Sequence, residues 1–155
     1  MKLRYALRVL GGVKLKIGID LDGVITSIGL LNPSVKLPRW LYIFIVPIVL
    51  LIVSNQKEEL RKIAANHTII IISARPHWCK NLTEKWLRYH QIPFDKLYCV
   101  GFGKGTKQRK LRVIERENID VFVDDNRRII KFLNRNGNSV KAVSKLKSLN
   151  GLIRT

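Results

Sequence analysis

The chain of 155 residues has room for one ordinary domain with a modest insertion, and its 46% hydrophobic and 26% charged residues exclude a wholly disordered protein. A formal net charge of +18, from 29 lysines and arginines against 11 acids, favours an anionic partner. Charge alone does not distinguish nucleic acid, a phosphorylated small molecule and acidic lipid. Cys79 and Cys99 lack the spacing of a zinc site or a disulfide framework, so we expect a cytoplasmic protein.

The predicted elements alternate along the chain. Residues 1–12 are basic, and Arg4 and Arg8 interrupt the apolar run that a secretory signal would need. Strands are predicted at 13–22, 68–72, 96–100, 119–123 and 139–143, and helices at about 56–65, 81–90, 106–118 and 127–134, with Thr106 as a helix cap. This alternation predicts an α/β three-layer, Rossmann-like domain with a central parallel sheet.

The segment from Trp40 to Val53, WLYIFIVPIVLLIV, is apolar throughout. It is shorter than the roughly twenty residues that a membrane-crossing helix needs. Two interpretations stay open: a capping helix bent at Pro47 that packs within the protein or a dimer, or an interfacial segment that makes the protein peripherally membrane-associated. We treat residues 1–155 as a single domain in which 27–66 form a small apolar cap or insert.

Two pairs of acids follow apolar strands. Asp20 and Asp22 stand one residue apart on a chain that we expect to be extended, so both carboxylates can approach one ligand. Like charges held that close need a cation or a shared proton. Asp124 and Asp125 repeat the pattern in VFVDDN. The sequence therefore predicts a site at the carboxyl ends of the strands, where open sheets of this kind bind ligands.

The segment DLDGVIT, residues 20–26, resembles the first signature of the haloacid dehalogenase superfamily, DxDGT/V. The other signatures of that family follow in order: Ser73 in SARP, a lysine that is Lys110 or Lys107, and the acids Asp124 and Asp125. The likeness spans residues 14–135 and is strongest to small 5′-nucleotidase-like members. The matching residues of their ARP…T…WL…gIPfD stretch are Ala74, Arg75, Pro76, Thr83, Trp86, Leu87, Ile92, Pro93 and Asp95.

The resemblance implies a role for each signature residue. Asp20 would be the nucleophile that is transiently phosphorylated, and Asp22 the general acid and then the general base. Ser73 would donate its hydroxyl to a phosphoryl oxygen, and Gly23, Ala74 and Arg75 would line the substrate site. Lys110 or Lys107, three residues apart on one predicted helical face, would offset the negative charge, with the distance to the last acids favouring Lys110.

The same resemblance implies a Mg²⁺ cofactor. Asp20 and the backbone carbonyl of Asp22 would bind the ion together with Asp125, with Asp124 in support. By contrast, Trp78 and Trp86 have helical spacing typical of core residues.

We therefore expect a magnesium-dependent phosphomonoester hydrolase that acts on a small phosphorylated substrate, nucleotides included. Two alternatives stay open. One directs the positive charge to nucleic acid and makes the protein a phosphatase for polynucleotide ends. The other is a membrane-associated binding protein with a vestigial site.

Overall fold

The structure, a computed structural model, describes residues 14–26, 56–137, 140–146 and 149. Its sheet has five parallel strands in the order β3-β2-β1-β4-β5. The strands are β1 (Lys16–Ile19), β2 (Thr68–Ser73), β3 (Lys96–Cys99), β4 (Val121–Val123) and β5 (Lys141–Val143). The first strand of the chain thus lies at the centre, with β2 on one side and β4 on the other, so residues far apart in sequence meet at one edge.

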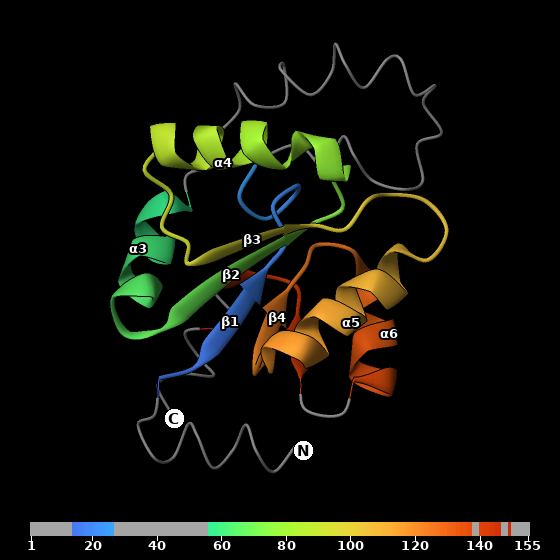
Figure 1. Cartoon of the computed structure of the whole chain (residues 1–155). Coiled ribbons are helices and arrows are strands. Elements are labelled where there is room, and N and C mark those ends of the chain that lie inside the picture. The colour runs from blue at the N-terminus through green and yellow to red at the C-terminus, as the bar shows by residue number, and fades with distance from the viewer. Residues whose placement is uncertain (1–13, 27–55, 138–139, 147–148, 150–155) are drawn as a thin grey trace.

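Helices cover both faces of the sheet (Figure 1). The helices α3 (Lys57–Asn66) and α4 (Lys80–Tyr89) cover one face, and α5 (Thr106–Glu117) and α6 (Arg127–Asn136) cover the other. A 3₁₀ turn, η1 (His77–Cys79), precedes α4. The fold class expected from the sequence, an α/β three-layer domain with a parallel sheet, is confirmed.

The side chains of strand β2 show why helices pack on both faces of the sheet. Its apolar side chains alternate between the faces, so Ile69 and Ile71 pack in the cluster beneath α3 and α4 while Ile70 and Ile72 pack beneath α5 and α6. All four are at most 1% exposed, and burying one such side chain stabilises the fold by roughly 1.5–3 kcal/mol. A run of isoleucines without polar alternation is therefore what a central parallel strand requires.

A glycine in β1 fits the same close packing. A Cβ at Gly18 would lie 2.6 Å from Cδ2 of Phe122 and 3.0 Å from Cδ1 of Ile119. Both neighbours are fully buried. Because the protein interior is closely packed, these side chains have no room to move aside for a Cβ. Gly18 thus lets the Phe122 ring of β4 lie directly against the backbone of β1.

Some local expectations are wrong. Thr106 is the first residue of α5 and not its cap; Gly105 caps the helix, and the Thr106 hydroxyl donates to the carbonyl oxygens of Gly101 and Gly103. Trp78 is 62% exposed and does not belong to the core, because it lies in η1 before the amphipathic helix begins, whereas Trp86 is 7% exposed and packs on the sheet.

The apolar segment Trp40–Val53 lies outside the described residues, so neither interpretation of it is tested here. Within the ranges that the structure describes, there is no helix of the length and apolar character needed to cross a membrane. The last residues of the region assigned to the insert form α3, whose Leu60 and Ile63 lie in the core.

Candidate active site

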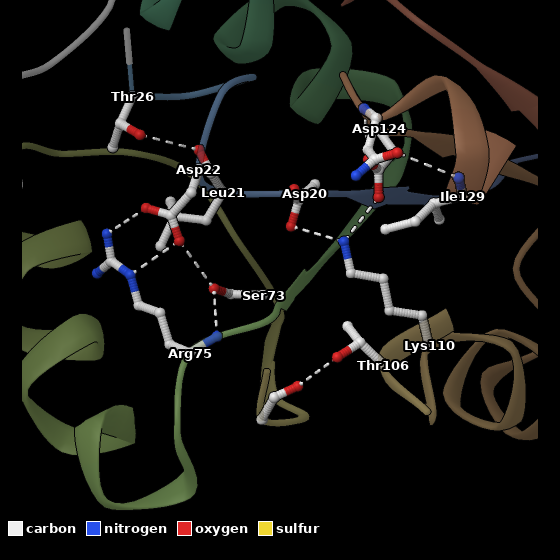
Figure 2. Close-up of polar contacts among 12 residues, drawn as sticks. Asp20, Leu21, Asp22, Thr26, Ser73, Arg75, Thr106, Lys110, Asp124 and Ile129 are labelled. Carbon is white, nitrogen blue, oxygen red and sulfur yellow. Dashed lines mark hydrogen bonds and ion pairs between the residues drawn. The ribbon is translucent and has the colours of Figure 1, made fainter. Parts of the chain in front are cut away.

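The signature residues meet at the carboxyl ends of three neighbouring strands (Figure 2). Asp20 follows β1, Ser73 ends β2 and Asp124 follows β4. Backbone hydrogen bonds extend the sheet past the strand ends, from the Asp20 amide to the Val123 oxygen at 2.8 Å and from the Asp124 amide to the Val143 oxygen at 3.1 Å. Because the strands are parallel, side chains that are distant in sequence converge there.

Helix α5 supplies the cation of this group. The Nζ of Lys110 lies 2.6 Å from Oδ2 of Asp124 and 3.0 Å from Oδ1 of Asp20. Its side chain is 1% exposed. Lys107, in contrast, is exposed and stacks its ammonium over the Phe132 ring. The structure therefore places Lys110 in the site and Lys107 outside it, although the sequence put both on one helical face.

The electrostatics of the buried group are unfavourable for a carboxylate. Burial raises the pKa of Asp20 well above its ordinary value, and the charges of Asp124 and Asp22 raise it further while Lys110 opposes them. Burial also acts against the ammonium of Lys110, but Asp20 and Asp124 outweigh it and raise the pKa of Lys110. One lysine is thus held charged between two acids whose negative charges repel each other.

Asp125 completes an acidic cluster that a cation could occupy. Asp20, Asp124 and Asp125 each offer a carboxylate oxygen, and these oxygens lie within 4.8 Å of one another. Burial, together with Asp124, raises the pKa of Asp125. Three hard oxygen donors around a single lysine leave net negative charge, which suits Mg²⁺ and the oxygen ligands that it prefers.

A glycine makes room for this cluster. Gly23 has φ +96°, and a Cβ there would lie 2.2 Å from Oδ2 of Asp125. Asp124 has less freedom, since its Oδ2 binds Lys110 and its Oδ1 accepts the backbone N–H of Asn126 at 2.8 Å. Asp124 is thus held by two hydrogen bonds, whereas Asp125 is exposed and lies beside the loop of Gly23.

Asp22 binds other protein groups than Asp20 does. Strand β1 ends at Ile19, so the alternation of an extended chain no longer applies at these residues. Asp22 turns toward β2, where it accepts hydrogen bonds from Ser73 and Arg75 (Figure 2). The two acids therefore bind different side chains of one site.

Arg75 is buried and bound to protein groups. Its Nη2 lies 2.7 Å from Oδ1 of Asp22, its Nε 3.1 Å from Oδ2 of Asp22, and its Nη1 3.2 Å from Oγ1 of Thr83. The side chain is 0% exposed. The structure thus places Arg75 against Asp22, with its three guanidinium nitrogens bound to protein groups, whereas the resemblance implied a substrate-binding residue.

The contacts that two residues make around the site could not be predicted from the sequence. Thr83 matched the nucleotidase-like pattern, but nothing in its spacing indicated that it accepts a hydrogen bond from Arg75. Arg109 ties down the glycine-rich loop before α5, donating to the carbonyl oxygens of Val100, Gly101, Phe102 and Lys104. In a chain with 29 basic residues, neither charge nor spacing singles it out.

The sheet order, the two helical layers and the acids at the ends of β1 and β4 define a Rossmann-like α/β protein with the haloacid dehalogenase-like fold. The resemblance seen in the sequence is confirmed at this level. A haloacid dehalogenase-like hydrolase from Streptococcus pneumoniae superposes with a TM-score of 0.52 over 90% of both chains, at 13% identity.

Two other solved structures show the same fold within longer chains, and one curated protein is similar in sequence. Two structures of the Pnkp1/Rnl/Hen1 RNA repair complex match 84% of this chain, with TM-scores of 0.61 and 0.60 and identities of 17% and 18%. The chain covers 42% and 46% of those chains. A nucleotidase from Clostridium acetobutylicum is 30% identical over 70 residues, which are 45% of this chain and 34% of the nucleotidase. No family model matches this chain.

Proposed function

We propose that this protein is a magnesium-dependent phosphatase that hydrolyses phosphomonoesters through an aspartyl phosphate at Asp20. The observation that carries the proposal is the convergence of Asp20, Lys110 and Asp124 at 2.6–3.0 Å, with Asp125 alongside. Phosphoryl transfer needs positioned charges more than covalent chemistry, and this arrangement can position them. The likeness to a nucleotidase and to a haloacid dehalogenase-like hydrolase supports the same reaction class.

In the first step, a carboxylate oxygen of Asp20 attacks phosphorus and the bond from phosphorus to the leaving oxygen breaks. Asp22 gives its proton to that oxygen, and the phosphoryl group stays on Asp20 as a mixed anhydride. Lys110, held charged beside Asp20, offsets the negative charge of the nucleophile and of the phosphoryl oxygens.

In the second step, a water molecule attacks the phosphoryl group and the bond from phosphorus to Asp20 breaks. Asp22, now ionised, takes the proton of that water, so the acid of the first step becomes the base of the second. Ser73 donates its hydroxyl to a phosphoryl oxygen, and the backbone of Gly23 and Ala74 borders the group. Inorganic phosphate and the free carboxylate of Asp20 result.

Asp20, Asp125 and the backbone carbonyl of Asp22 would hold Mg²⁺, with Asp124 in support. The close approach of the Asp125 carboxylate to Gly23, which a Cβ would prevent, and the three carboxylate oxygens within 4.8 Å fit such an ion. When bound, the ion supplies positive charge that offsets the repulsion between the acids and the phosphate.

The test is release of inorganic phosphate from an aryl phosphate and from a panel of nucleotides, with and without Mg²⁺. Asp20→Asn should lower the rate by about a thousandfold or more, because the nucleophile is lost. Asp95→Asn is the matched control: Asp95 accepts the backbone N–H of Ile69 at 2.7 Å, at the opposite end of the sheet. It should retain activity.

Equal rates for wild type and Asp20→Asn, or turnover that EDTA leaves unchanged, would contradict the proposal. Retention of ³²P on the acid-quenched wild type but not on Asp20→Asn would separate the aspartyl phosphate from direct attack by water.

A second candidate, a phosphatase of polynucleotide ends, has one specific observation in its favour. Helix α6 begins directly after the acidic pair and carries four basic residues and no acid: Arg127, Arg128, Lys131 and Arg135. Arg127 and Lys131 line an open hollow of about 410 Å³ together with Val143, which ends β5, and Ser144, which follows it at the same edge of the sheet. Such a surface suits a chain of phosphates.

The two candidates differ in their dependence on salt. For an oligonucleotide with a terminal phosphate, kcat/KM should fall steeply between 50 and 200 mM salt, on the order of tenfold or more, because each phosphate contact releases counterions. Arg127→Gln combined with Lys131→Gln should weaken that dependence and leave a mononucleotide unaffected. Equal salt dependence for both substrates would favour the small-molecule phosphatase.

A further inference from the structure

We propose that Arg75 is a positioning residue, which holds the carboxyl group of Asp22 in the orientation for proton transfer to the leaving oxygen. This inference rests on the phosphatase proposed above and assigns Arg75 a role different from substrate binding. Its basis is the direction of every polar group around Asp22.

The contact between Arg75 and Asp22 is a two-point fork. Nη2 binds Oδ1 at 2.7 Å and Nε binds Oδ2 at 3.1 Å, so the planes of guanidinium and carboxylate are fixed relative to each other. Both side chains are almost entirely out of solvent, at 0% and 8% exposed. A single contact would leave the carboxyl group free to rotate about its last bond, whereas the fork does not.

Arg75 is itself held from three directions. Its Nη1 donates to Oγ1 of Thr83 at 3.2 Å, its guanidinium lies 5.9 Å from the ring centre of Trp86, and its backbone N–H donates to Oγ of Ser73 at 3.1 Å. All three guanidinium nitrogens thus make a hydrogen bond within the protein. The side chain is also 0% exposed, so it offers no open surface to a phosphate, which is the reason for a supporting role.

Ser73 makes the fork necessary. Its hydroxyl donates to Oδ2 of Asp22 at 3.1 Å, yet the proposed reaction uses this hydroxyl for a phosphoryl oxygen. When substrate takes that donor, Asp22 loses one of its three hydrogen bonds and only the fork from Arg75 still orients it. The fork then keeps the plane of the Asp22 carboxyl group fixed while the proposed proton transfer to the leaving oxygen takes place.

The leaving group provides the test. Nitrophenolate departs without a proton, whereas the alkoxide of a nucleoside 5′-monophosphate needs one, so only the second substrate depends on general-acid catalysis. Arg75→Lys keeps the charge but loses the fork. We expect it to lower kcat/KM for the nucleotide by about ten- to a hundredfold and for nitrophenyl phosphate by less than about threefold.

A double-mutant cycle with Asp22→Asn shows whether Arg75 acts through Asp22. Adding Arg75→Lys to Asp22→Asn should lower kcat/KM for the nucleotide by less than about threefold, because the group that Arg75 orients is already lost. Arg88→Lys, the same exchange on the exposed side of α4, is the control and should change neither substrate.

Equal losses on the two substrates, or additive losses in the cycle, would overturn the role of Arg75 and leave the phosphatase intact. A wild type that releases phosphate from neither substrate would overturn the phosphatase and the inference with it. If Arg75→Lys does not fold, Thr83→Val replaces it. This variant removes one hydrogen bond of the guanidinium and should lower kcat/KM by about two- to fivefold for the nucleotide, with no comparable loss for nitrophenyl phosphate. An unselective loss in that variant would count equally against the inference.

Discussion

The two ends of the sheet both carry acids, but they use them differently. At the amino end, Asp95 accepts the backbone N–H of Ile69 at 2.7 Å and Asp120 accepts that of Lys16 at 2.9 Å, so each acid ties together the starts of two neighbouring strands. At the carboxyl end, Asp20 and Asp124 share one lysine and lie beside Asp125. Acids at one end bind the backbone, and acids at the other crowd one another.

The pKa shifts of the acids also differ between the two ends of the sheet. Hydrogen bonds from Lys96 and Tyr98 lower the pKa of Glu117, at the amino end, so folding stabilises its ionised form. Burial and neighbouring acids raise the pKa of Asp20, so folding destabilises its ionised form. An acid beside the end of a strand is therefore no sign of a site in itself. Acids that are buried together, at a cost to stability, are the better sign.

The largest effect should come from breaking the carboxyl-end cluster with Lys110→Met. The substitution leaves Asp20 and Asp124 buried without their cation, which should destabilise the fold by about 3 kcal/mol at neutral pH and lower phosphate release by about a hundredfold or more. Urea unfolding and the phosphate assay measure both. Lys107→Met, on the exposed side of the same helix, should change neither; a large effect there would contradict the assignment of Lys110.

A smaller effect is expected from Gly23→Ala, which places a methyl group against Asp125. Gly103→Ala is the matched control, because Gly103 also has a positive φ, +91°, but its Cβ would meet nothing within 4 Å. Both variants should lose about 1 kcal/mol of stability to backbone strain. Only Gly23→Ala should also raise, by about tenfold, the Mg²⁺ concentration needed for half-maximal activity; equal metal dependence in both would contradict a role for the Asp125 cluster.

At the amino end, Asp95→Ala should affect stability and not catalysis. It removes a charge-assisted hydrogen bond to the N–H of Ile69, worth about 1–2 kcal/mol, and Asp95→Asn should recover most of that because an amide oxygen also accepts. Denaturant unfolding gives the loss, and the rate per folded molecule should stay at the wild-type value. A fall in that rate would remove the contrast between the two ends of the sheet.

The smallest effect concerns the pH dependence of stability through Glu117. Since its pKa is lowered on folding, its contribution is complete above its ordinary pKa of 4.5 and is lost as the pH falls through the lowered value. Glu117→Gln should therefore lower the melting temperature at pH 7 and not at pH 2, and the difference should be small because its partner Lys96 is largely exposed. Melting curves displaced equally at both pH values would contradict this origin.

The order of the elements and the residues of the four signatures could be predicted from the sequence. Each strand is an apolar run and each helix has a periodic apolar face, so the local pattern reflects burial directly. The acids follow strands because the chain leaves the sheet there. Errors occurred at the boundaries of regular elements: Thr106, the first residue of α5, was assigned as its cap, and Trp78 was placed in the core although it precedes α4.

The sequence by itself determined the class of fold and the places of the four signatures, among them the proposed nucleophile Asp20 and the acids that could bind a cation, because these follow from the chain order of short local patterns. Only the tertiary structure decided that Lys110 and not Lys107 lies in the cluster, and that Asp22 is turned toward Arg75. The physical reason is that these choices depend on how α5 lies on the sheet and on where β1 ends. The spacing of residues along the chain does not predict how a helix is rotated about its axis relative to its neighbours.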